Sequence, residues 1–195
     1  GRWDWARNVF EAKAYESFAN SNQLATSPFS RHHARVKLGI LSDSHGRHER
    51  THKAVRLLLA NGAHELAHCG DIETEQVIDQ LVGIKTHLVF GNCDPDWRVL
   101  SRYALGLGVI VQHPLARFEC GGRTFAMTHG HDSDCVTAAL DEGVNYLLHG
   151  HTHVCRDEHH GATRIINPGA LHRASEFTVA LLDTNSDQLQ FLVVT

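Results

Sequence analysis

The sequence predicts an α/β fold with a mainly parallel sheet and a second sheet stacked on it. From Val36 onward, segments typical of strands alternate with segments typical of helices, as in proteins built from βαβ units. Several of the strand-like segments end in Asp, Asn or His, at the position where ligands bind in open α/β sheets. Further short strands in the second half of the chain indicate the second sheet.

Length and composition favour one globular domain. The chain has 195 residues, of which 42% are hydrophobic, and this is enough to build a substantial core. The formal net charge is −4 and no run of Lys or Arg stands out, so we expect no general nucleic-acid-binding surface. No apolar stretch approaches membrane-spanning length, so we expect no membrane segment.

The cysteines favour a reducing compartment. Five are present, at positions 69, 93, 120, 135 and 155, and none forms a C-x-x-C pair. The odd number argues against a disulfide framework. Because the N-terminus also lacks the basic and then apolar layout of a secretory signal, we predict a cytoplasmic protein.

Residues 1–35 differ from the rest, so we divide the chain into an N-terminal extension over 1–35 and a domain over 36–195. Trp3, Phe10 and Phe18 belong to a set of apolar residues at helical spacing, and residues 20–35 are polar, with Ser, Asn and Pro. This pattern predicts an amphipathic helix followed by a linker. Either the extension is a loosely docked appendage without catalytic role, or it contains a docking helix.

The first half of the domain predicts three strands, each followed by a helix. The predicted strands are Val36–Leu41, Glu65–Cys69 and Lys85–Phe90, and the predicted helices are Glu49–Ala60, Glu73–Leu81 and Trp97–Leu105. Asn61-Gly62 ends the first helix with a glycine suited to a left-handed cap.

The second half predicts more strands and one helix. The predicted strands are Val109–Val111, Ala116–Cys120, Thr124–Met127, Tyr146–Leu148, Thr163–Ile166, Phe177–Leu182 and Leu189–Val194, and the predicted helix is Ser133–Asp141. Gly121-Gly122 is typical of a two-residue hairpin turn. The turn-rich segment Asp183–Asp187 predicts that the last two strands form a hairpin.

Metal-competent side chains follow five of the predicted strands. The segment His149–His153 places His151 and His153 one residue apart, and Gly150 lets the backbone turn tightly, so one loop can serve two metal ions. The other four endings are Asp43-Ser44-His45, Gly70-Asp71, Gly91–Asp94 and His129–His131. Because the carboxyl ends of parallel strands meet at one edge, we expect these side chains to converge.

Several of these residues also have a plainer interpretation. Asp43 and Asp71 each precede a predicted helix and are candidates for N-caps. Three histidines inside strand-like runs are interpreted as core or supporting groups, namely His68, His87 and His149. Three others are expected to face solvent, namely His131, His159 and His160, and of these only His131 is a candidate to reach a substrate.

In their order along the chain, the motifs D-x-H, G-D, G-N-x-D, H-G and G-H-x-H resemble those of the calcineurin-like metallophosphoesterase superfamily. They are Asp43/His45, Gly70/Asp71, Gly91–Asp94, His129/Gly130 and Gly150–His153. The G-N-C-D motif, together with the turn Asn167–Ala170, is similar to a branch of small single-domain phosphodiesterases. The resemblance runs from about Val36 to the end of the sequence.

The resemblance implies a four-layer α-β-β-α sandwich with two stacked mixed sheets and a dinuclear metal site at the carboxyl ends of the strands. It implies that one metal is held by Asp43, His45, Asp71 and His153, and the other by Asp71, Asn92, His129 and His151. Asp71 would bridge the two ions, since a carboxylate has two oxygens whereas a neutral imidazole normally binds one ion.

The reaction that the resemblance implies is hydrolysis of a small phosphodiester or nucleotide-like substrate, with monoesters as poorer substrates. Two divalent ions that share a water lower its pKa, and the resulting hydroxide attacks phosphorus in line. Mixed nitrogen and oxygen ligands favour Mn, Fe, Zn, Ni or Co over Ca or Mg, and manganese is our first expectation. The sequence does not give the oligomeric state.

The sequence departs from the superfamily pattern at Cys93, where the commonest pattern has a histidine that contacts phosphate and protonates the leaving group. A thiol with a pKa of about 8.5 donates a proton reluctantly. His131, His172 or bulk water are candidates to replace it. We expect Asp94 to orient a metal-bound imidazole through a hydrogen bond and Arg173 to contact phosphate.

Two other classes of protein compete with an enzyme. The same fold occurs in a trafficking-complex subunit with a degenerate metal site, so a catalytically weak protein-binding scaffold is one alternative. All seven ligand positions carry metal-competent side chains, which favours the enzyme. A structural zinc protein is favoured less, because none of the cysteines is spaced for a closed four-ligand cage.

Overall fold

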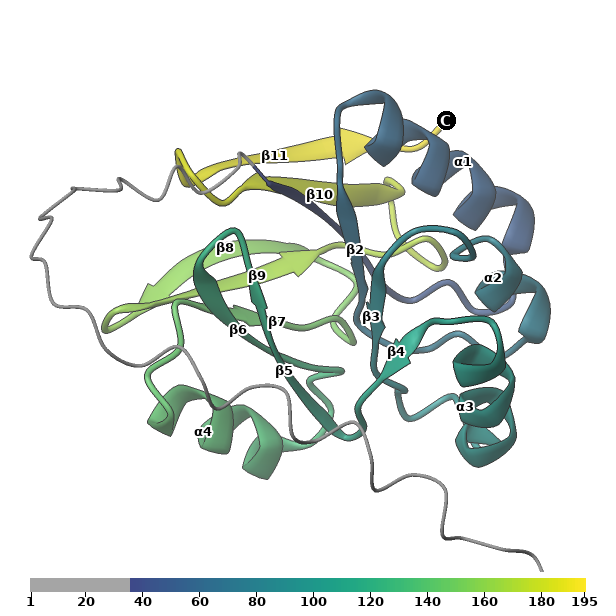
Figure 1. Cartoon of the computed structure of the whole chain (residues 1–195), viewed down its shortest axis with the longest axis horizontal. Helices are drawn as coiled ribbons and strands as arrows, with labels where there is room; N and C mark the ends of the chain where they lie inside the picture. Colours follow the sequence, from purple (N-terminus) through teal and green to yellow (C-terminus); the bar gives the residue numbers. More distant parts are fainter. Residues whose placement is uncertain (1–35) are drawn as a thin grey trace, which may run out of the picture. The chain divides into compact units, whose positions relative to one another are not determined.

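The computed structural model describes residues 36–195 (Figure 1). The strands are β1 (Lys37–Leu41), β2 (Glu65–His68), β3 (Thr86–Leu88), β4 (Ile110–Val111), β5 (Leu115–Cys120), β6 (Arg123–Thr128), β7 (Tyr146–Leu148), β8 (Cys155–His160), β9 (Thr163–Pro168), β10 (Thr178–Asp183) and β11 (Gln188–Val193). The helices are α1 (His48–Ala60), α2 (Glu75–Asp79), α3 (Trp97–Gly106) and α4 (Ser133–Asp141). Within this range, none of the helices is both long and apolar enough to cross a membrane. The helix and linker predicted within the first 35 residues lie outside the described residues.

The strands form two mixed sheets. The six-stranded sheet has the order β11-β10-β1-β2-β3-β4, and the five-stranded sheet has the order β5-β6-β7-β9-β8. Strands β1 to β4 are parallel to one another, whereas β10 is antiparallel to β1 and β11 is antiparallel to β10. In the second sheet β6, β7 and β9 are parallel, and β5 and β8 are antiparallel strands at the two edges. Each sheet therefore contains a parallel block whose strand ends point the same way.

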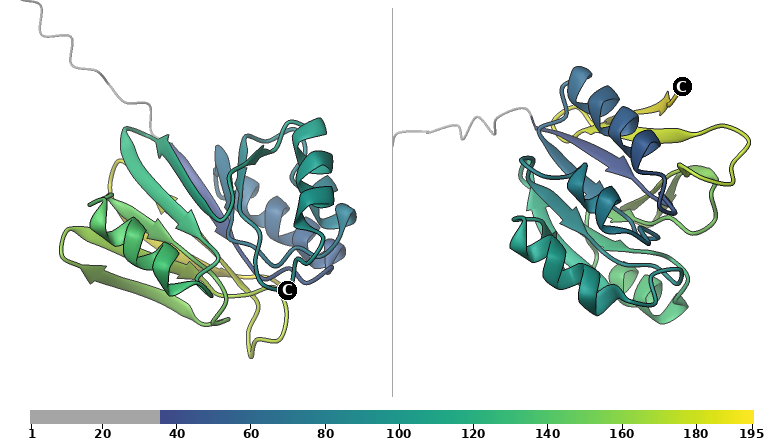
Figure 2. Two further views of the ribbon diagram at one scale, coloured as in Figure 1. Left: turned by 90° about the horizontal axis from the view of Figure 1, so that it is seen from below. Right: turned by 90° about the vertical axis from the view of Figure 1, so that its right-hand side faces the viewer.

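Three groups of buried side chains define four layers. The group between the sheets joins residues such as Ile40 of β1 to Phe125 of β6. Helices α1, α2 and α3 cover the outer face of the six-stranded sheet, with Leu58 fully buried there. Helix α4 covers the outer face of the five-stranded sheet through Ala139 and its neighbours (Figure 2, left). Burying one such Leu or Phe side chain stabilises the fold by about 1.5–3 kcal/mol. The two sheets and the helices on their outer faces confirm the predicted four-layer sandwich.

The predicted elements of the domain are present, and the differences have local causes. Helix α2 is shorter than predicted. Asp71 and Glu73 have left-handed backbone angles, so the chain up to Thr74 stays in a loop and the helix begins at Glu75. The predicted turn at Gly121-Gly122 and the hairpin of β10 and β11 are confirmed. Strand β8 was not predicted, because all six of its residues are exposed and polar or small, without the alternation that marks a half-buried strand. It is a strand because it pairs with β9 at the sheet edge.

Backbone hydrogen bonds join the loops that leave the parallel strands at their carboxyl ends. Asp43 after β1 donates its N–H to Gly70 after β2 (3.0 Å), and His45 donates to Asp71 (2.9 Å). In the other sheet, Gly150 after β7 donates to His129 after β6 (2.9 Å). These loops hold the candidate ligands, so their relative positions are set by backbone as well as by side-chain contacts.

Candidate metal centre

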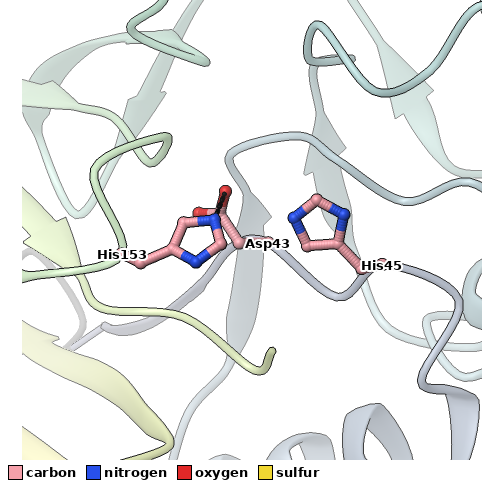
Figure 3. A group of neighbouring side chains, drawn as sticks. All are labelled: Asp43, His45 and His153. Atoms are coloured by element: carbon pink, nitrogen blue, oxygen red, sulfur yellow. Dashed lines mark ion pairs between the residues drawn. The ribbon is translucent and has the colours of Figure 1, made fainter. Parts of the chain in front are cut away.

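The seven candidate ligands lie in five loops at strand ends. Asp43 and His45 follow β1, Asp71 follows β2, Asn92 follows β3, His129 follows β6, and His151 and His153 follow β7. Potential ligand atoms lie within 4.8 Å of one another in three groups: Asp43 with His45 and His153, Asp43 with Asp71 and His129, and His45 with Asp71 and Cys93. Figure 3 shows the first group. Because the groups share Asp43, His45 and Asp71, they form one continuous centre.

Left-handed backbone angles are concentrated in these loops. Five of the seven candidate ligands have them, namely Asp43 (φ 54°), His45 (42°), Asp71 (56°), His151 (69°) and His153 (58°). This conformation costs roughly 1–2 kcal/mol for a residue other than glycine and is concentrated at functional sites in proteins. The turned backbone is therefore a structural argument, independent of side-chain type, that this region has a function.

Two glycines let the loops approach one another closely. A side chain at Gly91 would place its Cβ 2.1 Å from Oδ1 of Asp71, and one at Gly150 would place its Cβ 2.6 Å from Oδ2 of Asp43. The backbone does turn just after Gly150, where the N–H of Thr152 donates to the carbonyl of Gly150 (2.8 Å). This glycine is needed for the close approach to Asp43 and Ser42, and it lacks a left-handed backbone angle.

Three imidazoles each make a hydrogen bond through Nδ1, and this bond fixes the direction in which Nε2 points. In each case Nδ1–H donates to an oxygen: His45 to Oε1 of Glu73 (2.7 Å), His129 to the carbonyl of Cys69 (2.8 Å), and His153 to the carbonyl of Arg173 (3.3 Å). A neutral imidazole with its proton on Nδ1 offers the lone pair of Nε2 to a metal. The sequence analysis missed Glu73, which is the carboxylate that orients an imidazole here.

The free nitrogens point at the two buried carboxylates. Nε2 of His45 and Nε2 of His129 lie 3.5 and 3.3 Å from Oδ2 of Asp71, and Nε2 of His153 lies 3.1 Å from Oδ1 of Asp43. Among the described residues, Nε2 of His45, Nε2 of His129 and Oδ1 of Asp43 are buried and have no hydrogen-bond partner. Unsatisfied buried polar atoms are costly, so this donor set fits divalent metal ions.

The local charges also favour a bound cation. Burial raises the pKa of Asp71, but contact with His129 and the N–H of Cys93 outweigh it and hold this pKa well below its usual range. Burial lowers the pKa of His129, and its contact with Asp71 reverses that effect, so the net pKa is raised. A field that attracts a proton to Nε2 of His129 attracts a metal ion to the same place.

Asp94 supports the centre in a different way from the one predicted. Its Oδ1 accepts hydrogen bonds from the N–H groups of Ile72 (2.8 Å) and Glu73 (2.7 Å), and its Oδ2 accepts from Gly91 (2.8 Å). It therefore fixes two ligand-bearing loops through their backbones and does not orient an imidazole. Its carboxylate is buried, which raises its pKa, and the three N–H groups oppose that rise.

Two further buried residues join the loops. His68 accepts the N–H of Gly70 on Nδ1 and bonds Oγ of Ser44 through Nε2 (2.8 Å), and burial lowers its pKa to about 3, so it is neutral. Asn167 donates to the carbonyl of Gly150 (2.8 Å) and to Oγ1 of Thr152 (3.0 Å). The expectation that His68 supports the core is met, and the amide of Asn167 fixes the loop of His151 and His153.

The alternative interpretation of Asp43 and Asp71 as helix caps is wrong. The N-cap residues of α1 and α2 are Arg47 and Thr74. Oδ2 of Asp43 accepts from the N–H of His151 (3.2 Å), and Oδ1 of Asp71 accepts from the N–H of Cys93 (2.9 Å). Each carboxylate therefore connects two ligand loops.

The remaining predicted site residues lie at the surface of the centre. Asn92 and His151 are exposed, and the ring of His151 lies 5.2 Å from that of His129. His131 is exposed and lies 5.4 Å, ring to ring, from His129, and the ring of His172 lies 5.4 Å from that of His45. Arg173 is exposed, and its carbonyl, described above, contacts His153.

Cys93 is part of the convergent centre itself. Its Sγ accepts a weak hydrogen bond from the Asn92 amide (3.4 Å). Burial and the neighbouring carboxylate of Asp71 raise the pKa of the thiol to about 11. Without a cation beside it, the thiol keeps its proton at neutral pH and is a weak proton donor.

Comparisons with known proteins agree with this geometry. Residues 36–187 match the calcineurin-like phosphoesterase superfamily domain. The chain is 24% identical over 165 residues to phosphodiesterase MJ0936 of Methanocaldococcus jannaschii. The match covers 82% of this chain and 99% of that protein. The solved structure of a novel archaeal phosphodiesterase matches 81% of this chain and 99% of its own, with 25% identity and a TM-score of 0.74. The structure of YfcE, a phosphoesterase from E. coli, matches 82% of this chain and all of its own, with 22% identity and a TM-score of 0.62, which indicates the shared fold.

Proposed function

Because the chain belongs to the calcineurin-like phosphoesterase superfamily and is a metal-dependent phosphoesterase, we propose that it hydrolyses small phosphodiesters by in-line attack of hydroxide on phosphorus at a dinuclear centre. The observation that carries the proposal is the convergence of unpartnered Nε2 and Oδ1 atoms from several loops on Asp43 and Asp71. Within residues 36–195 no hydrogen bond satisfies these atoms, and coordination of metal ions would satisfy them.

We assign the candidate ligands to two metal positions. Asp43, His45, Asp71 and His153 would hold one ion, and Asp71, Asn92, His129 and His151 the other. Nε2 of His45 and Nε2 of His129 both lie near Oδ2 of Asp71, which supports a shared position for this carboxylate. Two bound divalent ions would supply a hydroxide nucleophile at neutral pH and would stabilise the charge that develops on phosphorus.

The protein's own groups orient this chemistry. Glu73, Cys69 and Arg173 hold the three imidazoles, so little reorganisation is needed when metal binds. Three side chains near the centre would contact the phosphate or its leaving group, namely the exposed His131 and Arg173 and the partly buried His172. Because the thiol of Cys93 stands where the superfamily pattern has a histidine and donates a proton reluctantly, a leaving group that departs unprotonated is favoured. We therefore expect diesters with acidic leaving groups as the better substrates.

The metal and the compartment follow from the ligand types and the cysteines. Mixed imidazole and carboxylate ligands support manganese first, with Fe, Zn, Ni or Co as other candidates. All five cysteines are free thiols, which supports a reducing, cytoplasmic location.

Metal analysis combined with an assay tests the function. The protein is purified, its metal content measured, and activity followed with bis(p-nitrophenyl) phosphate and p-nitrophenyl phosphate before and after chelation and reloading with manganese. We expect close to two metal equivalents, faster hydrolysis of the diester, and loss of activity with the chelator. A metal-free protein that retains full activity would refute the proposal. A metal-loaded protein that hydrolyses neither ester would favour the alternative function, a catalytically weak protein-binding scaffold.

A further inference from the structure

A cavity of about 560 Å³ lies between the start of α1 and the residues that follow β11. Figure 1 shows the end of β11 next to α1. The cavity is lined by the residues 46–50 together with Lys53, Phe177, Val194 and Thr195. Ligand sites for small molecules typically have volumes of roughly 300–1,000 Å³, so this space suits a nucleotide-sized group.

The cavity lining is rich in cations. Arg47, Arg50 and Lys53 line it, and Glu49 is the one acidic side chain among its lining residues. Arg50 is held in place, because its Nη1 donates to the carbonyl of Leu171 (2.6 Å) and its guanidinium lies 3.6 Å from the centre of the Phe177 ring. A guanidinium has five N–H donors, so a fixed Arg50 retains donors for a ligand.

The other two cations also keep donors. Lys53 donates to the carbonyl oxygen of Thr195 (3.0 Å), which uses one of the three N–H groups of an ammonium. Arg47 donates through Nε to Nδ1 of His172 (3.4 Å), and within the described part of the chain its terminal nitrogens have no hydrogen-bond partner. The cavity therefore offers several charged donors to one anionic ligand.

The cavity lies close to the metal centre along the chain and through His172. Gly46 and Arg47 line it and directly follow the candidate ligand His45, and two residues span at most about 7 Å of chain. His172 connects the same two places, since its ring lies 5.4 Å from that of His45 and its Nδ1 accepts from Arg47. A substrate whose reacting phosphate lies at the metal centre can therefore place a second group in the cavity.

We propose that this cavity binds a terminal phosphate of the substrate, so that the preferred substrates are phosphodiesters carrying a second, monoesterified phosphate. Arg47, Arg50 and Lys53 would bind its oxygens by charge-assisted hydrogen bonds, which are the strong class of such bonds. The inference rests on the proposed phosphodiesterase function and adds the chemistry that selects among diesters.

A matched pair of esters tests this selectivity in the metal-loaded protein. Both are p-nitrophenyl esters of thymidine 5′-phosphate, one with a free 3′-hydroxyl and one with a 3′-phosphate. We expect the wild type to prefer the 3′-phosphorylated ester by at least tenfold in kcat/KM, mainly through KM. The preference should fall at least fivefold in Arg47→Gln and in Lys53→Gln. Lys85→Gln removes the same charge next to Glu65, away from the cavity, and should keep the preference.

Calorimetry on the metal-free full chain separates this inference from the proposed function. We expect thymidine 3′-phosphate to bind the wild type and Lys85→Gln alike, and to bind Arg47→Gln and Lys53→Gln at least fivefold more weakly. Binding that is equal in all four proteins, or absent in all, would overturn the cavity proposal. If neither ester is hydrolysed while the binding difference remains, the phosphodiesterase proposal fails and the anion site stands.

Discussion

The two groups of candidate ligands differ in how firmly the protein orients their side chains before a metal ion binds. The inner group, Asp43, His45 and His153, converges within 4.8 Å, and both of its imidazoles are held by hydrogen bonds on Nδ1. The outer group, Asn92, His129 and His151, contains one buried and oriented imidazole, while Asn92 and His151 are exposed. Asp71 lies between them. A prepared position binds metal with little ordering cost, so the inner position should fill first and the outer one should exchange more readily with solvent.

The largest expected effect tests whether Asp71 joins the two groups. Asp71→Asn keeps the shape of the side chain but removes a charge felt at both positions, so kcat/KM should fall roughly 10³-fold or more. Asn92→Ala removes a neutral oxygen from the outer position alone and should cost roughly ten- to a hundredfold. Both variants are assayed with bis(p-nitrophenyl) phosphate at matched metal occupancy. Equal losses would contradict a bridging role and would remove the basis for comparing the groups.

The next prediction tests whether the hydrogen bond that orients His45 in the inner group increases metal affinity. Glu73→Ala leaves Nδ1 of His45 without its 2.7 Å partner, and loss of such supporting contacts costs roughly ten- to a hundredfold in metal affinity. Glu75→Ala removes an exposed carboxylate two residues away, in the first turn of α2, and is the matched control. Competition with a chelator measures the affinity of the first metal equivalent. An affinity that is the same in both variants would show that His45 needs no such support.

The sequence predicted the positions of the strands and the convergence of several candidate ligands better than the contacts that orient these side chains. Asp43, Asp71 and His129 follow apolar strands that are parallel, and parallel strand ends meet at one edge whatever the loops do. Glu73 and Asn167 act through contacts between loops, and Asp94 bonds backbone groups 21 to 22 residues away. Left-handed backbone angles at Asp43 or His153 have no local sequence signal, because they result from the packing of one loop on another.

A smaller effect is expected at Cys93, which lies beside both groups. A thiol donates a proton reluctantly, so kcat/KM of the wild type should fall steeply as the pKa of the leaving group rises. Cys93→His should flatten that dependence, because an imidazolium donates a proton near neutral pH, whereas Cys93→Ala should leave the slope nearly unchanged. The slope is measured with a series of substituted phenyl diesters. A flat wild-type slope with rate-limiting chemistry would identify another acid, and His131 and His172 are then the residues to replace.

The smallest effect at neutral pH is expected at His87, a buried histidine outside both groups. Its ring stacks on Phe118 at 3.9 Å, and both of its nitrogens are buried without a hydrogen-bond partner in the described chain. Burial, and then the charge of Lys85, lower its pKa to about 4, while Glu65 opposes them. An unpaired buried nitrogen is therefore not enough to indicate a metal site, because His87 meets no convergent set of ligands. It serves as the reference for the oriented imidazoles of the centre.

The pH dependence of folding checks that interpretation of His87. A pKa that is lower in the folded state than in the unfolded chain favours the neutral ring on folding, so its stabilising effect is complete above about pH 6.5 and is lost as the pH falls toward 4. His87→Phe keeps the stacked ring without a titrating group, so the free energy of unfolding should fall less between pH 7 and pH 5 than in the wild type, by about 1 kcal/mol. His160→Gln replaces an exposed histidine on β8 and should behave as the wild type does. Urea unfolding of the metal-free proteins at pH 7, 6 and 5 measures these differences. If His87→Phe shows the same decline as the wild type, the buried ring accepts a proton without cost, and an unpaired nitrogen would then be weaker evidence for metal binding at His45 and His129 as well.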